Sequence, residues 1–300
     1  LAQGEGQRPC GGGSGRGEVC VTEQHSKPCV MEAAARVVAT PAPDDKTRLA
    51  RETAAAWRAG ALALPDRDAP CRAPDAPGRP PHPELKPPGQ TPRRRLGSLE
   101  GRFALMHAVA HIEFNAIDLH FDMVARFAGD PRIADDQRAS FVSDWISVGD
   151  DEARHFTLVR DRLQQMGGDY GDLAAHDGLW EAAQNTAHDL AARLAVAPLV
   201  LEARGLDVTP QMIEKLSSVG DADSVAILSV IYEEEVGHVA AGARWFDHVC
   251  RDETDTPEHC FHRLVSTYFS GALKRPFNDD ARAAAGLPGC FYEPLAEQLS

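Results

Sequence analysis

The sequence of 300 residues lacks several features that would place it in common protein classes. No apolar run approaches the roughly 20 residues of a membrane-spanning helix, and no basic segment followed by an apolar one resembles a secretory signal. The seven cysteines are an odd number and form no Cys-x-x-Cys pair, which favours reduced thiols over a disulfide framework. Gly-rich phosphate loops and Gly-x-Ser-x-Gly elbows are also missing. We therefore expect a cytoplasmic protein that has no membrane attachment.

The charge of the chain is unevenly distributed. Residues 1–97 carry 15 Lys and Arg against 11 Asp and Glu, whereas residues 98–300 carry 16 against 34. The second part therefore accounts for more than the whole net charge of −14. A strongly acidic body repels phosphate backbones and anionic lipid surfaces. General nucleic-acid binding and membrane association are accordingly not expected.

The N-terminal third divides by composition into two segments. Residues 1–30 contain GGGSGRG and no hydrophobic period, which predicts a disordered extension. Residues 31–97 begin with a predicted helix and continue with ten prolines between Pro65 and Pro92. The proline-rich part must be extended. It is either a ligand for a partner domain or, as we favour, a strap laid along the acidic body.

From residue 98 onward the sequence changes to long helical stretches without strand-like alternation. Breaks rich in Gly, Asp or Pro separate four predicted helices, which cover residues 100–128, 136–166, 179–205 and 221–250. We predict an all-α fold in which residues 98–255 form a four-helix bundle. Residues 256–300 are predicted to form a C-terminal helix and an irregular tail that pack on this bundle.

Two of the predicted helices contain the spacing Glu-x-x-His. The second contains Glu152 and His155, and the fourth contains Glu235 and His238. This spacing places both side chains on one face of a helix, within reach of a common cation. Composition alone would give about one such pair in a chain of this kind. The position of each pair relative to the apolar residues therefore decides its meaning.

Both pairs interrupt apolar stripes that should face the interior of the bundle. The first helix places Glu113 on such a stripe, and the third places Glu202 there. A buried carboxylate is costly unless it is paired or bound to a metal. Glu113 and Glu152 are equally distant in sequence from the break between the first and second helices. Glu202 and Glu235 are equally distant from the break between the third and fourth. If each pair of helices is antiparallel, its two glutamates therefore lie at the same level. Four carboxylates, one per helix, therefore indicate a shared cation site.

The order Glu, Glu-x-x-His, Glu, Glu-x-x-His is the ligand pattern of a dinuclear carboxylate centre. Carboxylate with imidazole suits iron or manganese, and the absence of thiolate argues against structural zinc. The chain resembles the ferritin-like di-iron carboxylate superfamily, and within it a bacterial ferritin-like family without assigned function, the domain of unknown function 455. The likeness covers about residues 40–295 and rests on HAVAHIEFNAIDLHFD, DDEARHF, APLVLEARGLD and EEEVGHV, together with GRPPHPEL and KRPFNDDARAAAGL.

The resemblance implies two bound iron ions, with manganese or a mixed iron–manganese pair as alternatives. The ligands that it implies are Glu113, Glu152, His155, Glu202, Glu235 and His238. Either Glu152 with Glu235, or Glu113 with Glu202, could bridge the two ions. Ferritin-like bundles connect their second and third helices by a long crossover, so part of residues 171–186 is expected to belong to it. Pro198 is expected to kink the third helix one turn before Glu202.

Other polar residues near these stripes have alternative interpretations. His107 and His111 share a helix face and could form a second metal site, but we favour a polar surface or hydrogen bonds near the helix start. His120 and Tyr232 could lie next to the metal ligands, where they would orient a ligand or protect against stray oxidation, or they could be ordinary core residues. Two residues are expected to face solvent or to pair with arginine: Glu233 and Glu234.

The first hypothesis is an oxidoreductase in which two ferrous ions bind and reduce O₂ or peroxide, and its partner is a small-molecule substrate or O₂ or peroxide itself. Hydroxylation, as in the di-iron tRNA hydroxylase, and peroxide reduction both occur in the superfamily, and an electron donor would be a required partner. The alternative is a non-enzymatic protein that binds or delivers iron or manganese. A metal-free interaction module that uses the proline-rich strap is a third hypothesis. The oligomeric state stays open, with a dimer as one possibility.

Overall fold

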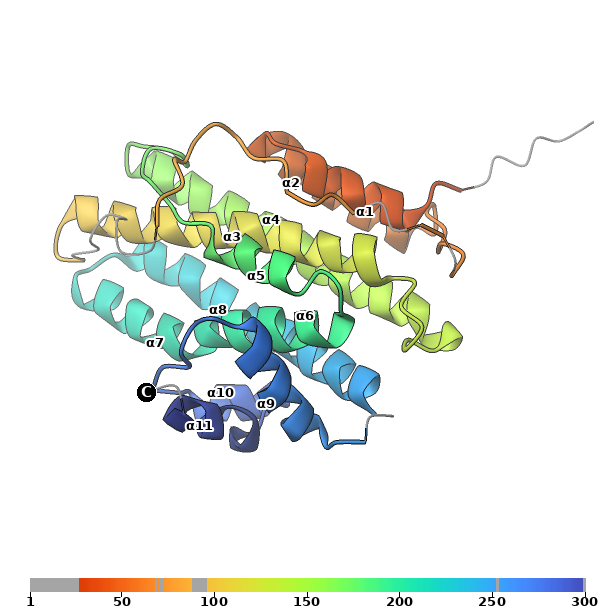
Figure 1. The fold of residues 1–300 in the computed structure, drawn as a ribbon. Helices are drawn as coiled ribbons and strands as arrows, with labels where there is room; N and C mark the ends of the chain where they lie inside the picture. Colours follow the sequence, from red (N-terminus) through yellow and green to blue (C-terminus); the bar gives the residue numbers. More distant parts are fainter. Residues whose placement is uncertain (1–26, 68, 71–72, 88–95, 252–253, 299–300) are drawn as a thin grey trace, which may run out of the picture.

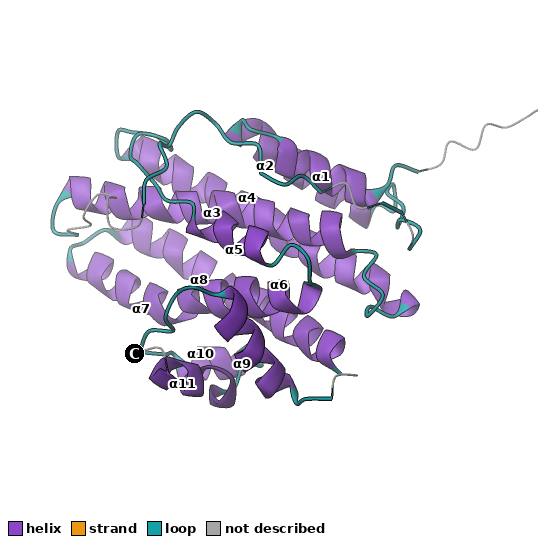
Figure 2. Cartoon of the chain, in the orientation of Figure 1, coloured by secondary structure: helices purple, strands orange, loops and turns teal. Residues whose placement is uncertain are grey.

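The computed structural model describes residues 27–67, 69–70, 73–87, 96–251 and 254–298. All regular elements in these residues are helices, as Figures 1 and 2 show, and the only extended pairings are two isolated bridges. The all-α prediction is therefore confirmed. None of the described helices has the length and hydropathy that crossing a membrane requires. The prediction of disorder for residues 1–30 falls almost entirely outside the described residues.

Three long helices and one composite rod form the centre of the molecule, which we call the helix core. The long helices are α3 (Leu99–Phe127), α4 (Arg138–Gln165) and α8 (Ala222–Cys250), and a short turn η1 (Asp135–Gln137) precedes α4. The rod consists of α6 (Leu190–Val196), η2 (Ala197–Glu202) and α7 (Ala203–Ser218). α3 packs against α4, α4 against α8, and α8 against the rod.

Side-chain caps fix where several of these helices begin. The Ser98 hydroxyl accepts a hydrogen bond from the Gly101 N–H at 3.1 Å at the start of α3. Asp189 does the same for α6, and Asp221 for α8. Because each cap satisfies an amide that would otherwise lack a partner, it stabilises its helix by about 1 kcal/mol.

The predicted third helix, residues 179–205, is wrong at both ends. A separate short helix, α5 (Gly178–Asn185), lies within the connection of residues 166–189 between α4 and the rod, which we call the crossover. The rod continues through the predicted break to Ser218. Pro210 inside α7 has no N–H for the carbonyl of Leu206, but Asn278 donates its side-chain amide to that oxygen at 3.1 Å. A tertiary contact thus compensates for the proline that suggested a break.

A π-helical segment occurs where Pro198 was expected to distort the rod. This segment, η2, ends at Glu202 and gives the rod one wide turn. Gly242 of α8 faces it, and a Cβ atom at Gly242 would lie 2.5 Å from the Cβ of Pro198. Only glycine therefore lets α8 approach the rod this closely. Wide turns of this kind are frequent at functional sites.

A helical hairpin covers one side of the helix core (Figure 1). Its helices, α1 (Val30–Ala39) and α2 (Pro43–Arg58), pack on α3 and α4. The Lys46 ammonium of α2 forms a fully buried ion pair with Asp118 of α3 and also donates to the Val38 carbonyl at 3.1 Å. The hairpin is therefore fixed to α3 by charge as well as by apolar contact.

The described part of the proline-rich segment runs over the same side of the core. The amide of Gly78 donates to the Val38 carbonyl at 2.8 Å, and the amide of Lys86 donates to Ala175 in the crossover at 2.7 Å. Arg79 pairs with Asp177, also in the crossover. This segment thus contacts both the hairpin and the crossover, whereas residues 88–95 lie outside the described residues.

Three helices cover the opposite side of the core (Figure 1): α9 (Pro257–Tyr268), α10 (Asp279–Ala284) and α11 (Gly289–Gln298). The predicted irregular tail is therefore largely helical. Pro294 lies inside α11, and the carbonyl that it leaves without a helical partner, that of Cys290, accepts a hydrogen bond from His262 at 3.0 Å. Arg282 of α10 binds Asp207 of α7 through two hydrogen bonds, which hold the three helices on the rod.

Candidate metal centre

The six residues proposed as ligands come together inside the helix core. Glu113 projects from α3, Glu152 and His155 from α4, Glu202 from the end of η2, and Glu235 and His238 from α8. The side chains of His155 and Glu152 are buried almost completely, and the most exposed of the six side chains, that of Glu235, is 12% accessible. The cluster is therefore an interior site with a carboxylate from each of the four helical units.

One side of the cluster is centred on His155. Its Nδ1 lies 3.3 Å from Glu113 Oε2 and 3.5 Å from Glu152 Oε2. Glu113, Glu152, His155 and Glu235 each offer a ligand atom within 4.8 Å of the others. These four residues alone could hold one metal ion.

The other side is centred on His238. Its Nδ1 lies 3.0 Å from Glu152 Oε1 and 3.6 Å from Glu235 Oε1. The two oxygens of Glu152 therefore face different imidazole rings. Glu152 occupies the middle of the cluster, where a carboxylate could bind one ion through each oxygen.

Glu202 completes this side and contacts a histidine outside the proposed ligand set. Its Oε1 lies 2.8 Å from Nε2 of His120. The other ring nitrogen of His120 donates to the Ala116 carbonyl at 2.8 Å, and the ring stacks on Trp145 with centroids 5.6 Å apart. His120 is thus held rigidly with Nε2 toward the cluster.

Many polar atoms of the cluster make no hydrogen bond of regular geometry among the described residues, although several lie within ion-pair distance of an imidazole nitrogen. They include both oxygens of Glu152 and of Glu202, one oxygen each of Glu113 and Glu235, and Nδ1 of both histidines. Buried polar groups in folded proteins are nearly always satisfied. Carboxylate oxygens and imidazole nitrogens that gather in this way are the ligand atoms that bound cations would use.

Asp151 and Glu234 also belong to the cluster, although the sequence interpretation had not assigned them to it. Glu234 Oε2 lies 2.6 Å from His155 Nε2, and Asp151 Oδ2 lies 3.5 Å from His238 Nε2. Arg154 pairs with both carboxylates. The available signal was an acidic residue directly before the Glu of each motif, in Asp-Glu-x-x-His and Glu-Glu-x-x-His.

The pKa values show how the cluster would share protons without cations. Burial, reinforced by neighbouring carboxylates, raises the pKa of Glu113 and of Glu202 well above the usual value. Burial also disfavours ionised Glu152, but the adjacent imidazoles of His155 and His238 outweigh it and lower its pKa. Burial opposes protonation of His155, yet Glu113 and Glu152 raise its pKa to about 11. Cations would therefore have to displace protons from this site.

His107 and His111 hold the crossover and are separate from the cluster. His107 Nε2 accepts the amide of Gly171 at 3.0 Å. The two ring nitrogens of His111 lie 2.9 Å from the Tyr170 hydroxyl and 2.9 Å from the His176 carbonyl. Burial lowers the pKa of both histidines to about 4. Their ring contacts support the hydrogen-bonding interpretation over a second metal site.

Tyr232 is engaged away from the two Glu-x-x-His pairs. Its hydroxyl oxygen accepts a hydrogen bond from the side-chain amide of Asn278 at 3.0 Å. Asn278 is the residue that also donates to Leu206 and caps α10. The Tyr232 hydroxyl therefore connects α8 to the C-terminal helices.

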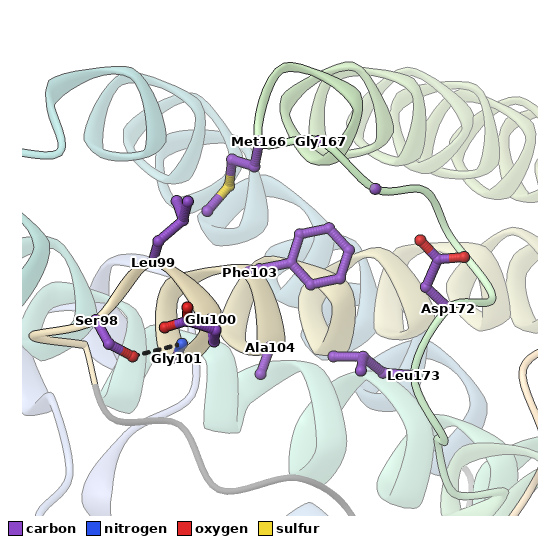
Figure 3. A pocket seen from close by; sticks show the side chains of 11 residues that line it. Ser98, Leu99, Glu100, Gly101, Phe103, Ala104, Met166, Gly167, Asp172 and Leu173 are labelled. Atoms are coloured by element: carbon purple, nitrogen blue, oxygen red, sulfur yellow. Dashed lines mark hydrogen bonds between the residues drawn. The ribbon is translucent and has the colours of Figure 1, made fainter.

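The most voluminous of the described cavities lies at the start of α3, away from the cluster. It measures about 580 Å³ and is formed by the first turns of α3 and the residues that follow α4. Figure 3 shows Leu99, Phe103 and Met166 around it, with the Ser98 cap at its edge. None of the six clustered residues lines this cavity.

Comparison with known proteins agrees with one part of the sequence resemblance, that to the domain of unknown function 455. The model of a family described as "Protein of unknown function (DUF455)" matches residues 39–293. The chain belongs to this family. It is similar to an uncharacterized protein of Haemophilus influenzae, with 42% identity over 207 residues that cover 69% of this chain and 72% of that protein. No solved structure matches the chain. The family match spans the complete cluster, so the predicted DUF455 resemblance is confirmed.

Proposed function

We propose that this DUF455 protein is a ferritin-like oxidoreductase, in which the helix core is a four-helix bundle that binds two iron ions and reduces O₂ or peroxide. The observation that carries this proposal is the set of buried, unsatisfied carboxylate and imidazole atoms. Four ionised carboxylates in one small volume would repel one another strongly. Two divalent cations would neutralise them and satisfy the same atoms, whereas Arg154 pairs only with Asp151 and Glu234 at the edge of the cluster.

The distances support one distribution of ligands over the two ions. Glu113 and His155 would hold the first ion, and Glu202 and His238 the second. Glu152 would be shared, because its two oxygens face the two imidazoles at 3.5 Å and 3.0 Å. Glu235 would be the second shared carboxylate, because it lies near His238 and belongs to the group around His155. This assignment favours Glu152 with Glu235 over Glu113 with Glu202 as the bridging pair.

The protein would orient its imidazoles through the carboxylates behind them. Glu234 and Asp151 face the Nε2 atoms of His155 and His238, so a proton held there leaves the Nδ1 lone pairs directed into the cluster. His120 would position Glu202, because its own ring is fixed by the Ala116 carbonyl and by Trp145. Two ferrous ions would supply two electrons to O₂ or peroxide. An electron donor is then the partner required for turnover.

Oxygen consumption tests this proposal against iron or manganese delivery. The protein would be loaded with Fe(II) without air and then exposed to O₂, with an oxygen electrode and Mössbauer spectroscopy as readouts. We expect rapid consumption and a coupled diferric spectrum, followed by repeated turnover when a reductant is added. Stable iron binding without oxygen consumption would contradict the enzymatic proposal and support the delivery alternative.

A further inference from the structure

A second, smaller cavity reaches the cluster itself. It measures about 170 Å³ and lies between α3, α7 and α8. The four glutamates proposed as ligands line it: Glu113, Glu152, Glu202 and Glu235. A molecule in this cavity would therefore sit directly against the ions that these carboxylates would hold.

The remainder of the cavity wall is almost entirely apolar. Aliphatic side chains supply most of it, among them Ala116 and Leu119 of α3, Met212 of α7 and Leu228 of α8. Ile112 also lines the cavity and is 47% exposed, whereas Leu119 is 3% exposed. The apolar surface thus continues from solvent to the buried carboxylates.

The cavity offers few polar partners other than the glutamates. Its lining includes the polar side chains of Thr209 and Arg204. Nη1 of Arg204 donates to the carbonyls of Lys274 and Pro276, which belong to the C-terminal segment. A polar group on a bound molecule would therefore lose its hydration with little compensation.

The volume limits the size of the group that fits. An apolar cavity of about 150 Å³ stays dry and accepts benzene or xenon. The present cavity is slightly larger, and its wall is of the same apolar kind except at the four glutamates, Thr209 and Arg204. It would accept a compact hydrocarbon group of about six carbon atoms.

We propose that this cavity is the substrate pocket, and that the substrate places a hydrocarbon group of about benzene size against the metal centre. The inference rests on the proposed function for the reaction itself. The binding of the hydrocarbon depends only on the shape and polarity of the cavity. The two can therefore be tested separately.

Gly205 provides a variant that fills the cavity. It lines the cavity from α7, and a Cβ atom built there would meet nothing within 4 Å. Gly237 of α8 is the matched control, because it is also helical, its Cβ would also meet nothing within 4 Å, and it does not line the cavity. Leucine at either position raises helix propensity equally. The two variants therefore differ in that only Gly205→Leu places a side chain in the cavity and reduces its open volume.

The experiment measures benzene binding to the Co(II)-loaded full chain by calorimetry and by the visible absorption of cobalt. We expect saturable binding to wild type and Gly237→Leu, with a change in the cobalt bands, and binding at least about tenfold weaker in Gly205→Leu. Cobalt content should equal that of wild type in both variants. If Gly205→Leu does not fold, Ala116→Leu fills the same cavity from α3.

The outcomes separate this inference from the proposed function. Equal benzene affinity in all folded variants, or benzene binding that leaves the cobalt bands unchanged, would overturn the substrate pocket. Absence of benzene binding to a wild-type protein that holds two cobalt ions would also overturn the pocket and leave the metal centre intact. Saturable benzene binding that is lost in Gly205→Leu, in a chain that takes up no metal, would support the cavity and contradict the proposed function.

Discussion

Glu234 of α8 lies 2.6 Å from His155 of α4, so each Glu-x-x-His helix supplies a carboxylate to the other. Asp151 of α4 makes the reciprocal approach to His238 of α8 at 3.5 Å. In both cases the acidic residue precedes the Glu of its own motif and faces the histidine of the partner motif. This exchange ties the orientation of both imidazoles to the packing of α4 on α8.

Replacing Glu234 should weaken metal binding without removing a direct ligand. Glu234→Ala frees the Nε2 atom of His155, and loss of such a supporting carboxylate typically costs about 10- to 100-fold in metal affinity. Competitive titration of Fe(II) or Mn(II) with a chelator measures the change. Glu233→Ala is the matched control, because Glu233 is the exposed neighbour on the same helix. Equal affinities in both variants would show that Glu234 has no supporting role.

Metal binding should release protons and should weaken as the pH falls. The pKa of His155 is raised to about 11, so this imidazole holds a proton at neutral pH in the absence of metal, and burial beside Glu152 raises the pKa of Glu113, which makes its proton harder to remove. A metal ion can bind only after these protons leave, and each proton released makes the apparent affinity rise by about tenfold per pH unit. Calorimetry in two buffers with different protonation enthalpies counts the protons. A pH-independent affinity would contradict this electrostatic account.

Gly242→Ala should destabilise the protein and disturb Glu202. The added Cβ would approach Pro198 to 2.5 Å and would push the π-helical segment away from α8. We expect a lower melting temperature and a reduced affinity for the second metal ion. In the control Gly237→Ala, the methyl group meets nothing within 4 Å, so this variant should instead gain about 0.5–1 kcal/mol from helix propensity. Similar melting temperatures for the two variants would exclude the proposed close approach.

Lys46→Met should strongly destabilise the N-terminal hairpin. Burial already raises the pKa of Asp118 to about 7 despite its ion pair with Lys46. Removing one partner of a buried pair costs about 3–5 kcal/mol, because the other charge stays buried and uncompensated. Unfolding in urea measures the loss. Lys46→Met combined with Asp118→Leu should recover part of it, and a double variant less stable than Lys46→Met alone would contradict this explanation.

The sequence predicted the three long helices of the core and the convergence of the six polar residues because both depend on local periodicity. A carboxylate such as Glu113 on an apolar stripe is visible without knowledge of the neighbouring helix. The role of Glu234 was not visible in the same way, because it lies next to the ligand stripe and faces another helix only through the packing of α4 on α8. The role of a residue that contacts a proposed ligand on another helix can be recognised only from the tertiary structure.

The errors in the third helix have a related physical origin. Pro210 is a strong local signal for a helix end, since it leaves the Leu206 carbonyl without its helical partner. Asn278, which lies 68 residues after Pro210 in the sequence, satisfies that carbonyl. His262 plays the same part for Pro294 in α11. Local propensity cannot anticipate compensation that comes from a distant segment.

The number of metal ions bound per chain tests the central claim most directly. Anaerobic loading with Fe(II), followed by removal of free metal and elemental analysis, should give two ions per chain for wild type and for Glu233→Ala. Glu235→Ala and His238→Ala should each lose at least one ion, because these residues belong to the cluster. A wild-type chain that retains neither iron nor manganese, or a Glu235→Ala variant that retains two ions, would contradict the dinuclear centre.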